Sequence, residues 1–234
     1  MRRKTPGNPQ APPPQDEFDR LDLVSLSTPV EGVFYRVHGL NASTGQPYPP
    51  IHFSQRGTSR FDPKSGPGTL CLADRLAVAL LEVFDDSWGA VGTPQRALTT
   101  SQLEQWWVSP VWLPQARVFD ARGANLSKIG TDLQFVAGRH STTRRWALQF
   151  ARYPTLLDGL LYPSRHTTTG FNVALFQRPR FTQAVSDPAL SFQVAHRPRN
   201  RHQLAFGTAI RLDAHPELYP VLTQLQVAIL PFLP

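Results

Sequence analysis

The sequence contains one cysteine, Cys71, among its 234 residues. A single thiol excludes an intrachain disulfide framework and a zinc site built from several cysteines. No apolar run approaches the roughly 20 residues of a membrane-spanning helix, so we expect no membrane partner. No apolar segment follows the basic start Met1–Lys4 either, and we therefore expect no secretory signal. These absences fit a protein of the reducing cytoplasm.

Motifs for bound cofactors are also absent. The chain has neither the glycine fingerprint of a Rossmann site nor that of a P-loop. Its seven histidines show no His-x-x-x-His spacing beside an acidic residue. We therefore predict no metal and no resident cofactor.

Lysine is scarce, with three residues against 21 arginines, and the net charge is +7. The excess is concentrated in residues 117–201, which hold twelve arginines and one lysine against four aspartates and no glutamate. Two interpretations stay open. The arginines form a solvated basic face, or they bind an acidic partner or nucleic acid.

The chain is long enough to bury a full core as one domain with appendages. Residues 1–29 are rich in proline and glutamine, with Pro12–Pro14 in the middle, and predict an extended or disordered tail. We expect the main domain at residues 30–178, and a C-terminal extension, residues 179–234, packed on that domain.

Hydrophobic periodicity predicts strands and helices that are interspersed without regular βαβ spacing, which favours the α+β class. Asp74 is the expected N-cap of the first helix, and Ser101 with Glu104 fits a capping box at the start of the second. The predicted strands are Val33–Val37, Arg117–Ala121, Gly159–Tyr162, Phe171–Phe176, Phe192–Ala195 and Leu204–Leu212, and the predicted helices are Arg75–Phe84, one from Thr100, Thr143–Arg152, and Pro216 toward Ile229.

Three short stretches carry candidate chemistry: Phe34–Arg36, Ala79–Glu82 and Asp158–Arg165. They place Arg36, Glu82 and Ser164 beside apolar runs that can hold these side chains rigidly. A guanidinium, a carboxylate and a hydroxyl together suit the binding of a phosphorylated ribose and the cleavage of its glycosidic bond.

The order of these stretches and their flanking residues resemble the RES family, bacterial toxins that degrade NAD and are named for Arg, Glu and Ser. The resemblance covers roughly Val30 to Gln177. It implies an ADP-ribosyltransferase-like fold, in which two small angled β-sheets with flanking helices hold NAD in the cleft between them. NAD is then a substrate and not a redox cofactor.

The resemblance also implies roles for single residues. Glu82 would offset the positive charge that develops on the ribose, and Arg36 and Arg60 would bind phosphate. The Ser164 hydroxyl would bind the ribose or the nicotinamide amide. The alternatives are a solvated helix carboxylate for Glu82, a strand-end ion pair for Arg36 and a turn residue for Ser164.

Cys71 departs from the family pattern, which usually has a tyrosine at this place. A thiol cannot stack on nicotinamide, so the pocket is rebuilt or the activity is weaker. Tyr35 and Tyr162 are candidates to replace the missing ring, and we include both with Arg60 and Cys71 among the substrate-binding residues.

The expected function is cleavage of the nicotinamide–ribose bond of NAD, with water or inorganic phosphate as the attacking group. Transfer of ADP-ribose to a macromolecule stays an alternative, as does a non-catalytic module that binds nucleic acid or an acidic partner. The resemblance further implies that the partner is a small antitoxin with a helix-turn-helix domain. We do not expect this chain itself to bind nucleic acid directly.

Overall fold

The computed structural model describes residues 11–84, 96–154, 157–165, 167, 169–192, 197–198 and 200–230. The chain divides into two compact units. Unit 1 comprises Met1–Val30, Phe53–Cys71 and Gln115–Thr182, and unit 2 comprises Glu31–His52, Leu72–Pro114 and Gln183–Pro234. The contacts group the C-terminal segment with two earlier segments in unit 2, and the predicted division at residues 29 and 178 stays a prediction.

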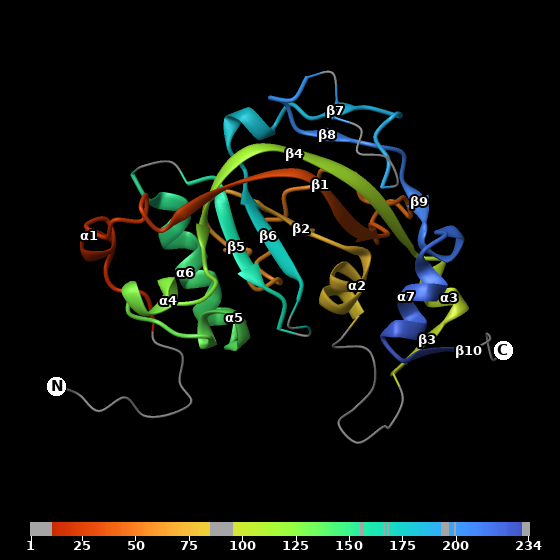
Figure 1. Ribbon diagram of the computed structural model, residues 1–234, viewed down its shortest axis with the longest axis horizontal. Helices are drawn as coiled ribbons and strands as arrows, with labels where there is room; N and C mark the ends of the chain where they lie inside the picture. Colours follow the sequence, from red (N-terminus) through yellow and green to blue (C-terminus); the bar gives the residue numbers. More distant parts are fainter. Residues whose placement is uncertain are drawn as a thin grey trace. The chain divides into compact units, whose positions relative to one another are not determined.

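Unit 1 is built on neighbouring strands in the order β2-β6-β5-β4 (Figure 1). The strands β5 (Gly159–Pro163) and β6 (Phe171–Phe176) pair antiparallel, with Leu161 opposite Val173, and both predicted strands are confirmed. On its other side β5 runs parallel to the end of β4 (Trp106–Asp120). β2 (Thr69–Ala73) begins in this unit.

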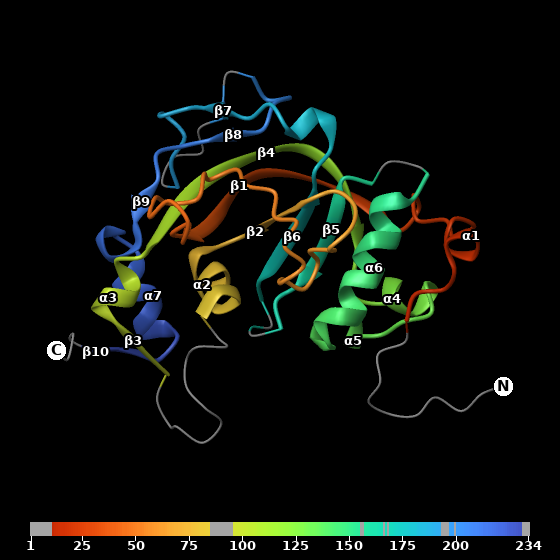
Figure 2. The ribbon, with the colours of Figure 1, turned by 180° about the vertical axis from the view of Figure 1, so that it is seen from behind.

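Helix α6 (His140–Arg152) covers one face of β5 and β6 (Figure 2). Trp146 and Phe150 recur at helical spacing on its buried face and join a core that also contains Leu160 and Phe176. The predicted helix is therefore confirmed, although it begins three residues earlier. The short helices α4 (Asn125–Lys128) and α5 (Gln134–Ala137) and the 3-10 helix η2 (Pro179–Phe181) complete the unit.

The described part of the predicted N-terminal tail is ordered. Helix α1 (Gln15–Phe18) precedes β1 (Ser27–Gly39), and Phe18 and Leu23 are fully buried. The Phe18 ring meets the Phe150 ring edge to face at 5.0 Å. Proline content misled the prediction, because one aromatic anchor buried in a core outweighs the extended preference of its neighbours.

Gly159 permits the close approach of β5 and β6. A Cβ atom at this position would lie 2.2 Å from the Ala174 carbonyl oxygen, which is backbone and cannot rotate away. Glycine is therefore required at the first residue of β5.

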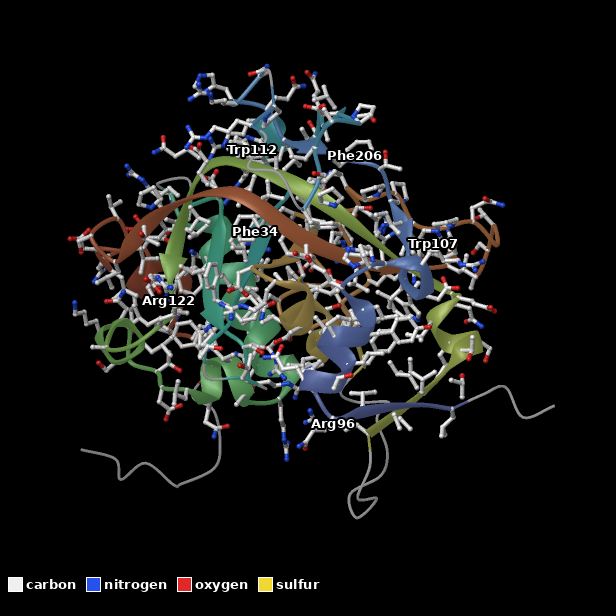
Figure 3. The ribbon with its side chains drawn as sticks, turned by 45° about the vertical axis from the view of Figure 1, so that its right-hand side comes forward. Phe34, Arg96, Trp107, Trp112, Arg122 and Phe206 are labelled. Atoms are coloured by element: carbon white, nitrogen blue, oxygen red, sulfur yellow. The ribbon has the colours of Figure 1, made fainter. Side chains whose placement is uncertain are left out.

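Unit 2 contains most of β1, the end of β2, and helix α2 (Leu76–Phe84). β1 and β2 pair antiparallel, with Tyr35 opposite Ala73. The first part of β4 carries two short antiparallel partners, β8 (Ala205–Phe206) and β9 (Ile210–Arg211), and β7 (Val185–Ser186) runs parallel to β8. Figure 3 shows Trp112 and Phe206 on the adjacent strands β4 and β8.

A second, two-stranded sheet lies in unit 2. It pairs β3 (Arg96–Thr99) in parallel with β10 (Val227–Leu230), and α3 (Thr100–Leu103) follows β3. The 3-10 helix η3 (Leu212–Ala214) and helix α7 (Leu218–Gln224) precede β10.

Several predicted boundaries in unit 2 are wrong. The helix from Pro216 ends at Gln224, and Gln226 then takes a left-handed φ of 56° that turns the chain into β10. The strand over 204–212 is interrupted at Gly207, where a Cβ atom would lie 2.1 Å from the Leu190 carbonyl oxygen. The capping box uses Thr99 and Gln102, two residues before the predicted pair.

The predicted strand Phe192–Ala195 lies largely outside the described residues. Parallel and antiparallel strand pairs occur together with helices in the protein, and the expected mixture of helices and strands is thus confirmed.

Candidate functional site

Four of the predicted site residues belong to unit 1: Arg60, Cys71, Tyr162 and Ser164. The first three adjoin or pack into the core that contains the buried Phe61 ring. The Phe61 ring lies 4.6 Å from the Tyr162 ring at the end of β5. Arg60 immediately precedes Phe61, and Cys71 on β2 packs against the core cluster that contains both rings. The loop that carries Arg60 and the end of β5 therefore lie together.

Ser164 follows β5 and is almost fully buried, with 6% of its surface exposed. Its backbone N–H donates to the Gly170 carbonyl oxygen at 3.0 Å and so continues the β5–β6 pairing by one rung. The strand end therefore fixes the backbone of Ser164, and the role of its hydroxyl in binding a ligand stays a prediction.

Cations gather around His140, the first residue of α6. Burial lowers the pKa of His140, and the positive charges of Arg60, Arg144 and Arg165 lower it further. Arg60 donates to the Gly138 carbonyl oxygen, and Arg144 donates to the His140 carbonyl oxygen at 3.0 Å. The charges of three guanidinium groups thus act on one imidazole and make its surroundings positive, which favours phosphate groups.

Sequence reasoning identified Arg60 and missed the other members of this cationic cluster. His140 and Arg144 come from α6, and Arg165 comes from the turn after β5. The only signal in the sequence was the excess of arginine over residues 117–201. That excess does not predict which of these arginines lie near His140 in the fold.

The remaining three predicted residues, Tyr35, Arg36 and Glu82, belong to unit 2. Tyr35 stacks on Phe192 with ring centroids 4.3 Å apart, and its hydroxyl donates to Glu217 at 3.2 Å. Burial, and then the Glu217 carboxylate, raise the pKa of Tyr35 to about 12. The proposal that Tyr35 replaces the missing tyrosine stays a prediction, with one face of its ring covered by Phe192.

Arg36 is half-buried on β1, two positions before the buried His38. Side chains two residues apart in a strand point to the same face. Burial, and then the charge of Arg36, lower the pKa of His38 to about 4. His38 Nε2 lies 2.9 Å from Ser109 Oγ, which holds the imidazole in place. Arg36 thus sits beside a neutral ring at pH 7.

Glu82 lies in the last turn of α2 and is exposed, whereas Leu80 and Leu81 are buried. The period of the helix explains this difference, because the inward stripe of α2 passes beside Glu82. A carboxylate near a helix C-terminus is not favoured by the helix dipole. Helix stability therefore gives no reason for an acidic residue at this position.

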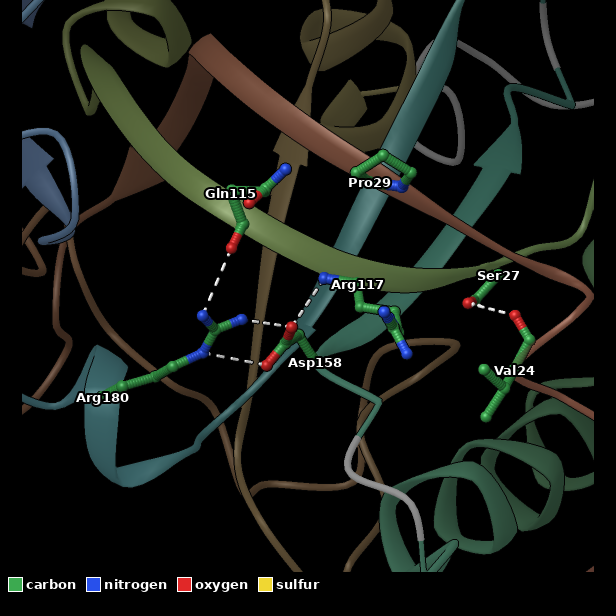
Figure 4. Close-up of a pocket in the computed structure, with 7 residues that line it drawn as sticks. All are labelled: Val24, Ser27, Pro29, Gln115, Arg117, Asp158 and Arg180. Atoms are coloured by element: carbon green, nitrogen blue, oxygen red, sulfur yellow. Dashed lines mark hydrogen bonds and ion pairs between the residues drawn. The ribbon is translucent and has the colours of Figure 1, made fainter.

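A cavity lies elsewhere in unit 1 (Figure 4). Its volume is about 420 Å³, and none of the predicted site residues lines it. The lining residues are Val24, Ser27, Pro29, Gln115, Arg117, Asp158 and Arg180.

Among the described residues, no three side chains of histidine, cysteine, aspartate or glutamate gather as a metal site would require. None of the helices in that part of the chain has the length and apolar character needed to cross a membrane.

Comparison with solved structures finds a similar fold in the crystal structure of the M. tuberculosis MbcT–MbcA toxin-antitoxin complex. The TM-score is 0.54 at 18% sequence identity, and the match covers 88% of this chain and 97% of the other. Among curated proteins there is no match. The family model of the RES domain matches residues 33–195, more than half of the sequence. The chain therefore belongs to the RES domain family.

Proposed function

We propose that this protein cleaves the bond between nicotinamide and ribose in NAD and acts as the toxin of a toxin–antitoxin pair. The observation that carries the proposal is the RES domain match over residues 33–195, which include Arg36, Glu82 and Ser164. The likeness in fold to a chain of the MbcT–MbcA complex supports it. An ADP-ribosyltransferase-like arrangement of two angled sheets is part of the same proposal.

In the proposed reaction the bond between C1′ of the ribose and the nicotinamide nitrogen breaks. Its electron pair leaves with nicotinamide, which departs neutral, so no strong general acid is needed. Positive charge develops on the ribose, and the Glu82 carboxylate offsets it. Water or inorganic phosphate then adds to C1′, and attacking water loses one proton to solvent.

The other residues hold the dinucleotide. Arg36 and Arg60 bind its phosphates, and the Ser164 hydroxyl binds the ribose or the nicotinamide amide. Tyr162 and Cys71 belong to the wall of the site. The cationic cluster around His140 supports the role of Arg60, because neighbouring guanidinium groups raise the local concentration of a diphosphate.

The test is release of nicotinamide from NAD by the purified protein. We expect Glu82→Gln to lower the rate by about 100-fold or more, the usual effect of removing one electrostatic stabiliser of a transition state. Glu104→Gln is the matched control, since Glu104 is also an exposed carboxylate of unit 2 and should leave the rate unchanged. Equal rates in wild type and Glu82→Gln, or no release by wild type, would reject the proposal.

The fate of the ADP-ribose half separates the related reactions. Free ADP-ribose from NAD labelled in this half indicates hydrolysis, and a phosphate ester formed only with added phosphate indicates phosphorolysis. Label on a macromolecule indicates ADP-ribosyl transfer.

The proposed partner is a small helix-turn-helix antitoxin that blocks the site. The likeness in fold to the MbcT–MbcA toxin–antitoxin complex supports a partner of this kind. Adding the product of an adjacent small open reading frame should suppress nicotinamide release in the same assay. Unchanged release would remove the partner from the proposal and leave the enzyme.

A non-catalytic module is the second candidate, favoured by the cationic cluster and by Cys71 in the place of the family tyrosine. Such a module would bind nucleic acid with a steep dependence on salt and would release no nicotinamide.

A further inference from the structure

The cavity described above is separate from the predicted catalytic residues of unit 1. Asp158 lies immediately before β5 and Ser164 immediately after it, so the two residues mark opposite ends of the same strand. A strand rises roughly 3.3 Å per residue, which puts them about 20 Å apart. The cavity has a volume of about 420 Å³, which falls within the range typical of small-molecule sites.

The floor of the cavity is a buried carboxylate whose charge is already balanced. The Asp158 side chain is 7% exposed and accepts the Arg117 backbone N–H at 2.6 Å. It also accepts from Nε of Arg180 at 3.1 Å and from Nη2 of the same guanidinium (Figure 4). A carboxylate with these three donors is a poor ligand for a cation, because its lone pairs are engaged.

Arg180 is held rigidly but keeps hydrogen-bonding capacity. Its third hydrogen bond goes from Nη1 to the Gln115 carbonyl oxygen at 3.2 Å, and the guanidinium lies 4.5 Å from the centre of the Phe181 ring. A guanidinium carries five N–H donors. Two therefore make no hydrogen bond within the described residues, on a side chain that is 49% exposed.

Arg117 adds a second guanidinium. The side chain is exposed, and within the described part of the chain it makes no hydrogen bond, ion pair or ring contact (Figure 4). Two guanidinium groups against one carboxylate leave the cavity with one net positive charge. The charge is held on planar donors that match an oxyanion in two-point geometry.

The remaining wall is partly apolar. Val24 and Pro29 are exposed and line the cavity, and the Ser27 hydroxyl donates to the Val24 carbonyl oxygen at 2.7 Å. The serine oxygen thus keeps its lone pairs for a donor on a ligand. A ligand that satisfies this site has one oxyanion and a compact apolar body.

We propose that this cavity, at the Asp158 end of β5 and away from Ser164, is a binding site for a small organic anion whose charged group is a carboxylate or a phosphate monoester. Arg117 binds the oxyanion directly, Arg180 contributes its two remaining N–H donors, and Val24 and Pro29 contact the apolar body. Asp158 is a positioning residue that orients Arg180.

The test is calorimetric titration of the full chain with benzoate and with phenyl phosphate, which share a ring and differ in the oxyanion. We expect saturable binding of at least one probe, and the tighter probe identifies the oxyanion. Arg117→Gln should weaken that binding about tenfold or more, since it removes a charged hydrogen-bonding group. We expect folding to be preserved because this guanidinium has no hydrogen bond, ion pair or ring contact to lose within the described residues.

Two control variants separate the site from general surface charge and from the proposed NAD site. Arg145→Gln removes another exposed guanidinium of unit 1, and Arg60→Gln removes a proposed NAD-binding group. Both should leave the affinity for the probe unchanged. Absence of saturable binding of either probe would overturn the proposal, as would an equal loss in Arg145→Gln or Arg60→Gln. None of these outcomes depends on cleavage of NAD.

Discussion

The cores of the two units are made of different side chains. In unit 1, nine of the nineteen buried cluster residues are aromatic, among them Phe18, Phe61 and Phe150. In unit 2 only Phe84 is aromatic among the fifteen buried cluster residues, and leucine, valine and alanine supply the rest. Both cores join segments that are distant in the sequence, and helix α2 alone supplies six of the fifteen residues in unit 2.

This difference shows how each unit positions its polar residues. Aromatic rings are large and rigid and meet edge to face, so a few of them can fix loops that lack secondary structure. Phe61 does this for the loop of Arg60. Unit 2 instead fixes polar groups through paired side chains, His38 with Ser109 and Tyr35 with Glu217.

The largest expected effect concerns the two cores. Phe150→Ala should lower the free energy of unfolding by about 3–5 kcal/mol, and Leu80→Ala by about 2–5 kcal/mol. We expect the larger loss at Phe150, because its ring also contacts Phe18 and Phe119 at centroid distances of 5.0 and 4.7 Å. Urea denaturation of both variants measures the difference. A loss at Leu80 that equals or exceeds the loss at Phe150 would contradict the contrast between the cores.

An intermediate effect concerns the buried histidine of unit 2. The pKa of His38 is lowered to about 4 in the folded state, so between pH 6.5 and pH 4 the unfolded chain binds a proton that the folded chain does not. Its contribution to stability is complete above pH 6.5 and is lost as the pH falls through this window. The loss should reach about 3 kcal/mol near pH 4.

Unfolding free energies at pH 7 and pH 5 test this expectation. His38→Gln should reduce the dependence on pH, whereas His202→Gln, at an exposed position, should leave it as in wild type. The same slope in all three proteins would show that His38 does not control the acid sensitivity.

The smallest effect concerns the Tyr35–Glu217 hydrogen bond. Tyr35→Phe removes one donor and should cost about 1 kcal/mol of unfolding free energy. Tyr219→Phe is the control, since Tyr219 is 59% exposed, and it should cost nothing measurable. If the two variants were equally stable, paired polar groups would not contribute to the stability of unit 2.

Elements with strong local patterns could be predicted from the sequence. Helix α6 and the β5–β6 pair follow from the spacing of apolar residues alone, to within three residues at their ends. The order of the N-terminal segment could not be predicted, because it depends on one ring, Phe18, meeting residues more than 120 positions later. β10 was missed because its partner β3 is equally remote.

The site shows the same limit. The end of β5 and the position of Ser164 could be predicted from the sequence. That the charges of Arg60, Arg144 and Arg165 act on His140 could be learned only from the fold. The cavity in unit 1 could not be predicted for a related reason. Its carboxylate, Asp158, is engaged by a backbone N–H 41 positions away and by Arg180 from a separate 3-10 helix, and no local pattern encodes either contact.

Because Gly159 has no side chain, it couples the β5–β6 pairing to the position of the Asp158 carboxylate. Any larger residue there would push the first rung of β5 away from Ala174, and the carboxylate of the preceding residue would be displaced with it. Loss of that carboxylate from its three donors would release Arg180 from the cavity wall. The absence of a side chain at Gly159 therefore sets the distance between β5 and β6 on which the geometry of the cavity depends.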